Sequence, residues 1–185
     1  MKFMYYVLCL SLLFMGCKDA NEKSNTMEGE TEMSMDDVFN KNSETVMASI
    51  KAWQNEKLDY SMYSDNFVML ETGFGAEKDS VSLAEMKESD KMLWKDYDFK
   101  LMTDPVVLLP GVNSDTKKPD GSVRHYSHWE VTRVATDSMP AKSGVIHIYE
   151  SYDFDENGKI MYQQGYGDFT GLMMFLNKKD EMEKK

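Results

Sequence analysis

The sequence predicts a single α+β domain, in which N-terminal helices pack on one face of a curved antiparallel β-sheet. Two patterns support this prediction. Early in the chain, apolar residues recur every three or four positions, as they do on one face of a helix. The second half instead holds long runs in which apolar and polar residues alternate, as they do in strands. Helices followed by a meander of strands are typical of the α+β class.

The helical half begins with a predicted helix over residues 36–55. Val46, Ile50 and Trp53 stand four and three positions apart, so they share one helix face that can pack on a core. The chain then predicts further short elements before its strand-rich half: a helical turn over 58–63, a strand over 67–70, a glycine-containing turn over 71–75 and a helix that begins at Ser82.

The second long helix has a recognisable start. Ser82 is followed three residues later by Glu85, the arrangement of a capping box, in which each side chain bonds the other residue's backbone N–H. Four strands should follow this helix, the first of them broken at Asp104-Pro105: 97–109, 123–134, 145–155 and 160–169. Asn157-Gly158 lies between the last two, and this dipeptide is a strong hairpin signal.

The N-terminal segment has the features of an export signal. Lys2 precedes an apolar run over 3–15 that is too short for the ~20 residues of a membrane-spanning helix. The run ends at Gly16-Cys17, which resembles the lipobox of bacterial lipoproteins and implies acylation of Cys17. The alternative is an ordinary secretory signal with an incidental cysteine. We therefore expect four regions: a signal peptide over 1–16, a flexible tether over 17–35, the folded domain over 36–177 and a charged tail over 178–185.

Composition excludes several classes of function. The formal net charge is -11, and so acidic a surface repels phosphate backbones, which argues against a nucleic-acid partner. Of the two cysteines, Cys9 leaves with the signal peptide, so neither a disulfide nor thiol catalysis is expected. No phosphate-binding glycine loop or nucleophile turn is present, and we expect no cofactor.

The N-terminal signal predicts a location in the cell envelope, with the protein lipid-anchored at the outer membrane or surface of a Gram-negative bacterium.

Two segments carry a resemblance to a known family. The stretch over 53–71, WQNEKLDYSMYSDNFVMLE, and the closing hairpin over 149–169, YESYDFDENGKIMYQQGYGDF, resemble the nuclear transport factor 2-like superfamily, which includes SnoaL-like polyketide cyclases and ketosteroid isomerases. The resemblance covers 36–177 and implies a cone fold with a cavity between sheet and helices. Because this superfamily includes enzymes, transport adaptors and binding domains, it implies the fold more than the function.

The resemblance to the isomerases also implies two candidate catalytic carboxyls. Glu71 takes the position of a base at the end of the first strand, and Glu150 that of a neutral hydrogen-bond donor. Alternation independently puts Glu150 on one face with Ile146, Ile148, Tyr152 and Phe154, where a lone carboxylate is costly unless it is protonated, paired or beside a cavity. The alternatives are a solvated Glu71, and an ion pair of Glu150 with Arg124, Arg133 or His128.

Further residues complete the predicted ligand pocket and its alternatives. One face of the last strand, with Tyr162, Gln164, Tyr166 and Asp168, suits a small-molecule cavity but equally a dimer surface. No metal site is expected. His125 and His128 face opposite ways on one strand, and His128 and His147, which can face each other near Glu130, lack a third ligand at fixed spacing. The predicted pocket residues are Trp53, Tyr152, Tyr166, Asp168 and His128.

Three functional hypotheses remain at this point. The preferred one is a domain that binds a small, partly hydrophobic ligand, because no complete catalytic set is present. The second is an acid/base isomerase or cyclase that acts on a carbonyl compound, with Glu71 as base and Glu150 as hydrogen-bond donor. The third is an interaction module that forms a homodimer through the open face of the sheet.

Overall fold

The computed structural model describes residues 33–179. The predicted signal peptide, Cys17, most of the tether and the last six residues of the tail lie outside the described residues. Within 33–179, no helix is both long enough and apolar enough to span a membrane. The described chain forms one compact unit. Its elements, in chain order, are α1 (Met35–Gln54), a 3-10 helix (Tyr60–Met62), β1 (Tyr63–Leu70), β2 (Ser80–Ser82), α2 (Leu83–Asp96), β3 (Tyr97–Leu101), β4 (Leu108–Val112), β5 (Pro119–Arg133), β6 (Lys142–Phe154), β7 (Ile160–Tyr166) and α3 (Phe169–Asn177).

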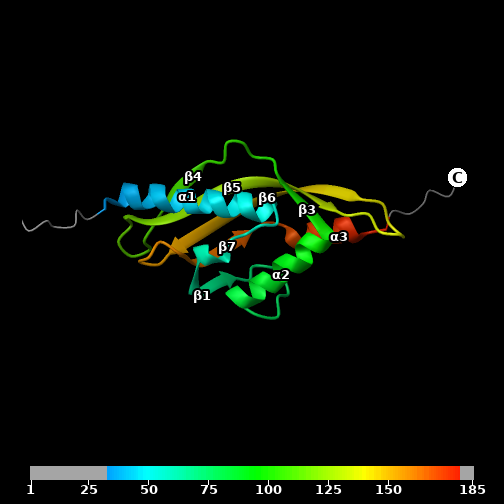
Figure 1. Ribbon diagram of the computed structural model, residues 1–185, viewed down its shortest axis with the longest axis horizontal. Coiled ribbons are helices and arrows are strands. Elements are labelled where there is room, and N and C mark those ends of the chain that lie inside the picture. The colour runs from blue at the N-terminus through cyan, green and yellow to red at the C-terminus, as the bar shows by residue number, and fades with distance from the viewer. Residues whose placement is uncertain (1–32, 180–185) are drawn as a thin grey trace, which may run out of the picture. The chain divides into compact units, whose positions relative to one another are not determined.

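The seven described strands form one curved, open sheet in the order β2-β1-β7-β6-β5-β3 (Figure 1). β4 also pairs with β5, beside its N-terminal half, whereas β3 lies beside its C-terminal half. The predicted α+β class is confirmed. One pairing differs from the expected antiparallel sheet, because β1 and β7 run parallel. A parallel pair needs a long connection between its strands, and most of the domain lies between these two, so no local turn signal reveals their direction.

The three helices cover the inner face of the sheet, which holds the core. α1 packs on β5 and β3, α2 on β1, and α3 on β6, as Figure 1 shows for the positions of the helices. From Val123 onward β5 alternates, so that Val123, Trp129 and Val131 are buried on the inner face while Tyr126 and His128 are exposed on the outer face. Each residue's parity on these strands therefore decides whether it meets the core or solvent.

Local signals are confirmed at α2 and at the last hairpin. Ser82 accepts from the backbone N–H of Glu85, and the Glu85 side chain accepts from that of Ser82. A hydrogen bond from Lys78, supported by those of Ser82, lowers the pKa of Glu85 to about 2. Between β6 and β7, Gly158 has a φ of 73°, a left-handed conformation that glycine adopts without strain.

The structure corrects the prediction for the C-terminal end of the domain. The strand expected over 160–169 ends at Tyr166, and a helix, α3, follows it. α3 begins at the cap Asp168, whose side chain accepts from the Gly171 N–H at 2.9 Å. It lies close to β6 because Gly144 has no side chain there, and a Cβ on Gly144 would meet Leu172 Cδ1 at 2.8 Å. Leu172 and Leu176 form the buried face of α3, but the exposed Met174 and Phe175 are apolar as well, so the buried face does not stand out in the sequence.

Asp90 connects three of the helical elements. This residue of α2 is buried and accepts from Trp53 Nε1 of α1 at 3.0 Å and from the Tyr60 hydroxyl at 2.8 Å. Burial raises the pKa of Asp90, and these two hydrogen bonds oppose that rise. One carboxyl group thus fixes α1 and α2 relative to each other.

Replacing this carboxyl should destabilise the domain. Asp90→Ala leaves the Trp53 N–H and the Tyr60 hydroxyl without their acceptor in a buried place, so we expect a loss of about 2–4 kcal/mol in the free energy of unfolding. Urea unfolding followed by tryptophan fluorescence measures it. The matched control is Asp98→Ala, on an exposed position of β3. Equal losses in the two variants would contradict the role given to Asp90.

Candidate functional site

A cavity of about 210 Å³ lies between the inner face of the sheet and the helices. Most of its wall is apolar and aromatic. Trp53 lies at the centre of this wall, with its ring centroid 4.4 Å from that of Phe99 and 5.6 Å from that of Trp129. α1, β1, α2, β3, β5, β6, β7 and α3 all contribute lining residues, among them Ile50, Met69, Met86, Val131, Ile146, Ile148, Leu172 and Met173.

The cavity also has polar lining groups, of which Glu150 on β6 is central. One carboxylate oxygen, Oε1, lies 3.3 Å from the Tyr152 hydroxyl and 3.3 Å from Gln163 Nε2, both of which donate to it. The other oxygen, Oε2, lies 3.3 Å from Nε2 of His125. The Glu150 side chain is 15% exposed. Glu150 thus keeps a carboxylate beside the cavity with neighbours that are close but not tightly bonded.

His125 is the partner of Glu150. The two residues are directly opposite on β5 and β6, the His125 side chain is completely buried, and its ring stacks on that of Tyr152. Neither His125 ring nitrogen has an aligned hydrogen bond within residues 33–179, so the Glu150 carboxylate is its nearest acid. At 3.3 Å the two groups lie at the edge of the about 2.6–3.2 Å reach over which an acid and a base pass a proton directly.

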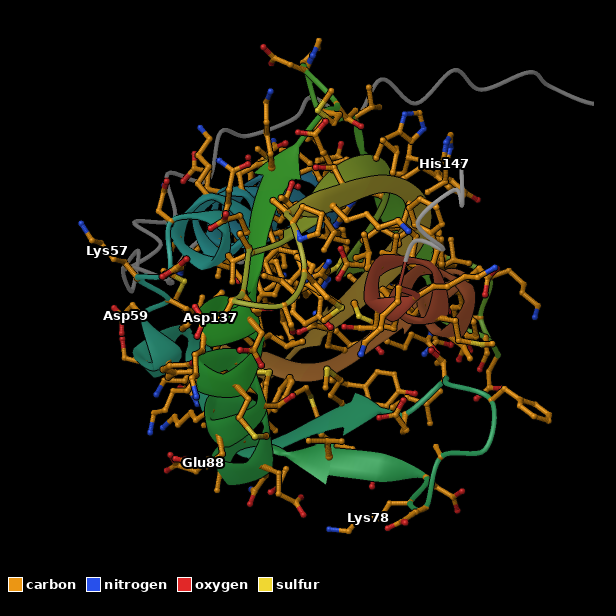
Figure 2. The ribbon with its side chains drawn as sticks, turned by 90° about the vertical axis from the view of Figure 1, so that its right-hand side faces the viewer. Lys57, Asp59, Lys78, Glu88, Asp137 and His147 are labelled. Atoms are coloured by element: carbon orange, nitrogen blue, oxygen red, sulfur yellow. The ribbon has the colours of Figure 1, made fainter. Side chains whose placement is uncertain are left out.

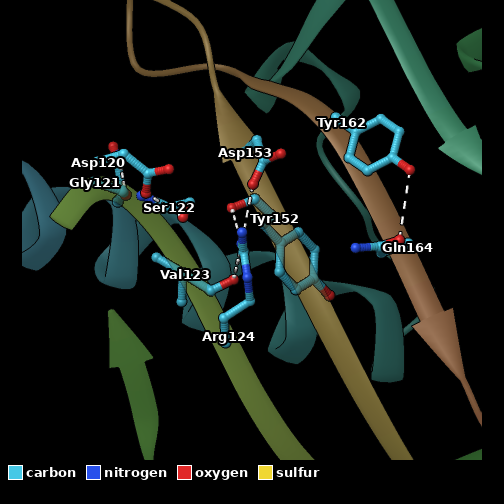
Figure 3. Close-up of polar contacts among 10 residues, drawn as sticks. Asp120, Gly121, Ser122, Val123, Arg124, Tyr152, Asp153, Tyr162 and Gln164 are labelled. Atoms are coloured by element: carbon cyan, nitrogen blue, oxygen red, sulfur yellow. Dashed lines mark hydrogen bonds and ion pairs between the residues drawn. The ribbon is translucent and has the colours of Figure 1, made fainter. Parts of the chain in front are cut away.

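The partners proposed from the sequence lie elsewhere. Arg124 is on the outer face, where it donates to Asp153 Oδ1 at 3.0 Å and to the Tyr152 carbonyl (Figure 3). Arg133 donates to the carbonyls of Leu176 and Pro140. His128 is exposed on the outer face and does not line the cavity. The positions of Arg124 and His128 follow from the parity of β5, on which odd-numbered residues point inward.

Two buried tyrosines also lie along the cavity. The hydroxyl of Tyr63 lies 2.9 Å from that of Ser49. Burial raises the pKa of Tyr63, and burial followed by the neighbouring Glu150 charge raises the pKa of Tyr152. Both hydroxyls therefore stay protonated at neutral pH and remain available as hydrogen-bond donors.

Of the predicted site residues, Trp53, Tyr152 and Glu150 line the cavity. Glu71 does not. β1 ends at Leu70, so the strand alternation that would turn Glu71 inward stops one residue earlier. The Glu71 side chain is exposed and accepts from the Gly73 N–H at 3.1 Å in the following turn. The structure therefore does not bring Glu71 and Glu150 together.

Tyr166 and Asp168 also lie away from the cavity. Tyr166 is 49% exposed and donates to Gln164 Oε1 at 3.2 Å, and Gln164 also accepts from Tyr162 (Figure 3). Asp168 caps α3. The inward face of β7 is the opposite one, represented in the cavity wall by Gln163. The two tyrosines of β7 share the outer face with Gln164, whereas the residues of opposite parity are Met161, Gln163 and Gly165. Each face thus has one glutamine, so polarity does not distinguish them.

Several residues of the site were not predicted from the sequence. His125 and Gln163 contact Glu150, and the wall formed by α3 includes Phe169, Leu172 and Met173. A signal for His125 was present, because it shares its parity with the apolar Val123, Trp129 and Val131 of β5. No corresponding signal marked α3. In the described part of the chain, no three His, Cys, Asp or Glu side chains are grouped so as to hold a metal ion.

Several solved structures are similar to this chain in fold. A candidate polyketide cyclase from Xanthomonas campestris pv. campestris matches with a TM-score of 0.56 at 12% identity, over 72% of this chain and 95% of its own. An NTF2-like protein from Anabaena variabilis ATCC 29413 matches with a TM-score of 0.53 at 13% identity, over 77% and 98%.

This chain has the NTF2-like cone fold. An LEH-like epoxide hydrolase of M. tuberculosis shares it, with a TM-score of 0.52 at 15% identity over 74% of this chain and 90% of its own. No protein-family model and no curated protein sequence matches the chain. At such low identities the NTF2-like neighbours establish the fold alone. The function has to be argued from the cavity.

The buried tyrosines predict a loss of stability in alkali. Free tyrosine has a pKa of about 10, and the folded state holds the pKa values of Tyr63 and Tyr152 above this. The unfolded chain therefore releases both protons first. The stabilisation is complete below pH ~10 and falls as the pH rises further, by about 1.4 kcal/mol per pH unit for each tyrosine.

Urea unfolding between pH 9 and 12 measures this slope. Tyr152→Phe should lower the slope by about 1.4 kcal/mol per pH unit, the share of one tyrosine, because Tyr60, Tyr63 and Tyr162 also have raised pKa values and keep the remainder. Tyr126→Phe is the matched control, because Tyr126 is 62% exposed on the outer face. A slope that Tyr152→Phe leaves unchanged would show that this tyrosine ionises as freely in the folded state as in the unfolded chain.

Proposed function

We propose that this domain binds a small, largely apolar molecule in its cavity and is held at the cell envelope by a lipid on Cys17. The observation that supports ligand binding is the cavity itself. Its aromatic wall faces a single lining carboxylate, Glu150, and the buried imidazole of His125 lies behind that carboxylate. Concave apolar sites with a few converging polar groups are the usual form of small-molecule sites.

The size and polarity of the cavity define the ligand further. An engineered cavity of about 150 Å³ holds benzene, so about 210 Å³ suits one aromatic ring with short substituents. The Glu150 carboxylate accepts hydrogen bonds, and Gln163 Oε1 is a buried acceptor with no partner among the described residues. A ligand hydroxyl would donate to one of these acceptors and a primary amine could donate to both, and such a bond is favoured because an unpaired buried acceptor is costly.

The proposed attachment rests on the sequence. The apolar run that ends at Gly16-Cys17 supports a lipidated N-terminus at the outer membrane or surface of a Gram-negative cell, with the polar segment up to residue 35 as a spacer. In the same proposal, the outer face of the sheet, with its exposed Tyr126 and Tyr166, is the surface through which two copies would pair.

Acid/base catalysis is the second candidate, and the Glu150–His125 pair favours it. An isomerase or cyclase needs a group that accepts a proton and a group that returns or stabilises it. Glu150 and His125 lie 3.3 Å apart, but Glu71, the base suggested by the family resemblance, lies outside the cavity. Ligand binding does not require a second carboxyl group at the cavity, so we prefer binding to catalysis as the proposed function.

Ligand binding predicts a selective effect of Glu150. Calorimetric titration with 4-ethylphenol should show saturable binding to the parent protein, and Glu150→Gln should weaken it about tenfold, because a hydrogen bond to a charged acceptor is replaced by a neutral one. Ile148→Trp should abolish binding by filling the cavity. Conversion of a carbonyl compound by the parent protein, lost in Glu150→Gln, would favour the catalytic candidate instead.

Glu71→Gln is the matched control for this experiment. It makes the same chemical change at a carboxylate outside the cavity wall, and 4-ethylphenol should bind it as it binds the parent. Binding that survives Ile148→Trp, or that falls equally in Glu71→Gln and Glu150→Gln, would contradict the proposed site.

The attachment predicts a modified Cys17. Mass spectrometry of the protein purified from a Gram-negative host should show a mature chain that begins at a diacylglyceryl-modified Cys17, and the protein should fractionate with membranes. Cys17→Ser should release it from the membrane fraction, because no lipid can then be attached. An unmodified mature N-terminus at another residue would reject the anchor and leave the ligand proposal untouched.

A further inference from the structure

Two of the chain's three histidines face each other on the outer face of the sheet. His128 of β5 and His147 of β6 are direct cross-strand partners, and the centroids of their rings lie 4.0 Å apart. Both side chains are exposed, and Figure 2 shows His147 at the surface. The pair is separate from the cavity, because its residues have the opposite parity to the cavity-lining residues of the same strands.

The ring nitrogens of this pair are available to a ligand. Within residues 33–179, no hydrogen bond or ion pair engages an imidazole nitrogen of His128 or His147; the Thr103 hydroxyl contacts only the backbone N–H of His128. By contrast, His125 is buried beside Glu150. In a single copy of the chain, His128 and His147 thus present unengaged lone pairs on the same outer face that the proposed dimer would use.

The strands hold these two side chains in register. β5 and β6 pair continuously from Val123 opposite Tyr152 to Arg133 opposite Lys142, and the histidines lie within this ladder. A rigid scaffold reduces the entropy lost when two ligands close on one ion. In the unfolded chain this strand pairing is lost, and nothing holds the two histidines beside each other.

We propose that His128 and His147 chelate a divalent transition-metal ion of the zinc or copper class. A tetrahedral ion with Zn–N bonds of about 2.0–2.1 Å holds two nitrogens roughly 3.4 Å apart. Two rings with centroids 4.0 Å apart reach that separation by small rotations of exposed side chains. Imidazole favours Zn²⁺, Cu²⁺ and Ni²⁺, whereas Mg²⁺ and Ca²⁺ require oxygen ligands.

Two protein ligands define the kind of site. Structural zinc sites use four protein ligands and catalytic ones three, and no third carboxylate, cysteine or histidine joins this pair in the described chain. The ion would therefore keep positions for water or for an external donor, and would bind less tightly than in a closed site. The acidic protein, with a net charge of -11, favours the approach of a cation.

Zn²⁺ titration of the full chain by calorimetry tests the proposal. We expect one ion per chain and an affinity at least tenfold weaker in His128→Gln and in His147→Gln, because each loses one of two chelating nitrogens. The double variant should not bind at this site. Electron paramagnetic resonance of bound Cu²⁺ should show coupling to two imidazole nitrogens in the parent and to one in each single variant.

Glu130→Gln is the control for general electrostatic attraction. Glu130 lies on the same face of β5, two residues beyond His128, and its removal should change the Zn²⁺ affinity by less than about threefold while both histidines remain. Zn²⁺ should also raise the Tm of the parent but not of the double variant, since only the folded chain holds the pair together. Equal Zn²⁺ binding by the parent and the double variant, or a loss in Glu130→Gln as large as that in the histidine variants, would overturn the proposal.

Discussion

The antiparallel register between β5 and β6 is the constraint on which the rest of the domain depends. On the inner face it sets His125 opposite Glu150 and Trp129 opposite Ile146, and on the outer face it sets His128 opposite His147. Because successive strand residues point to opposite faces, a slip of one residue in either strand would exchange the residues that this strand presents to the cavity with those that it presents to the outer face. The same pairing therefore builds the cavity and the histidine pair at once, and neither can move without the other.

The register also explains how a carboxylate is tolerated beside an aromatic cavity. Desolvation of Glu150 is offset by hydrogen bonds from the Tyr152 hydroxyl and the Gln163 amide, each 3.3 Å from Oε1, while the imidazole of His125 lies 3.3 Å from Oε2. These neighbours come from β5, β6 and β7, so the group is assembled by strand pairing. Contacts of this length leave the carboxylate able to accept a shorter bond from a ligand.

Sequence reasoning succeeded where one strand supplied all the information. Alternation within β6 was enough to put Glu150, Ile148 and Tyr152 on the cavity side. It failed for Glu71, because the pattern was extended one residue past the end of β1. It failed for Tyr166, because β7 has a glutamine on each face, Gln164 beside the tyrosines and Gln163 opposite, and only the pairing of β7 with β6 and β1 decides which face is inward. α3 and the parallel pairing of β1 with β7 depend on contacts between distant segments, which no local pattern encodes.

The cavity persists because the helices are fixed at its margins and the walls cannot collapse. Asp90 fixes α2 to α1 through Trp53, and Gly144 sets the approach of α3 to β6, while large rings such as Trp53, Phe99 and Trp129 brace one another. The apolar wall that these contacts hold apart is surface that the fold itself does not bury. A ligand that covers this wall gains roughly 25 cal/mol for each Å² of apolar surface that it removes from water. The contacts that keep the walls from closing on each other are therefore the ones that favour binding.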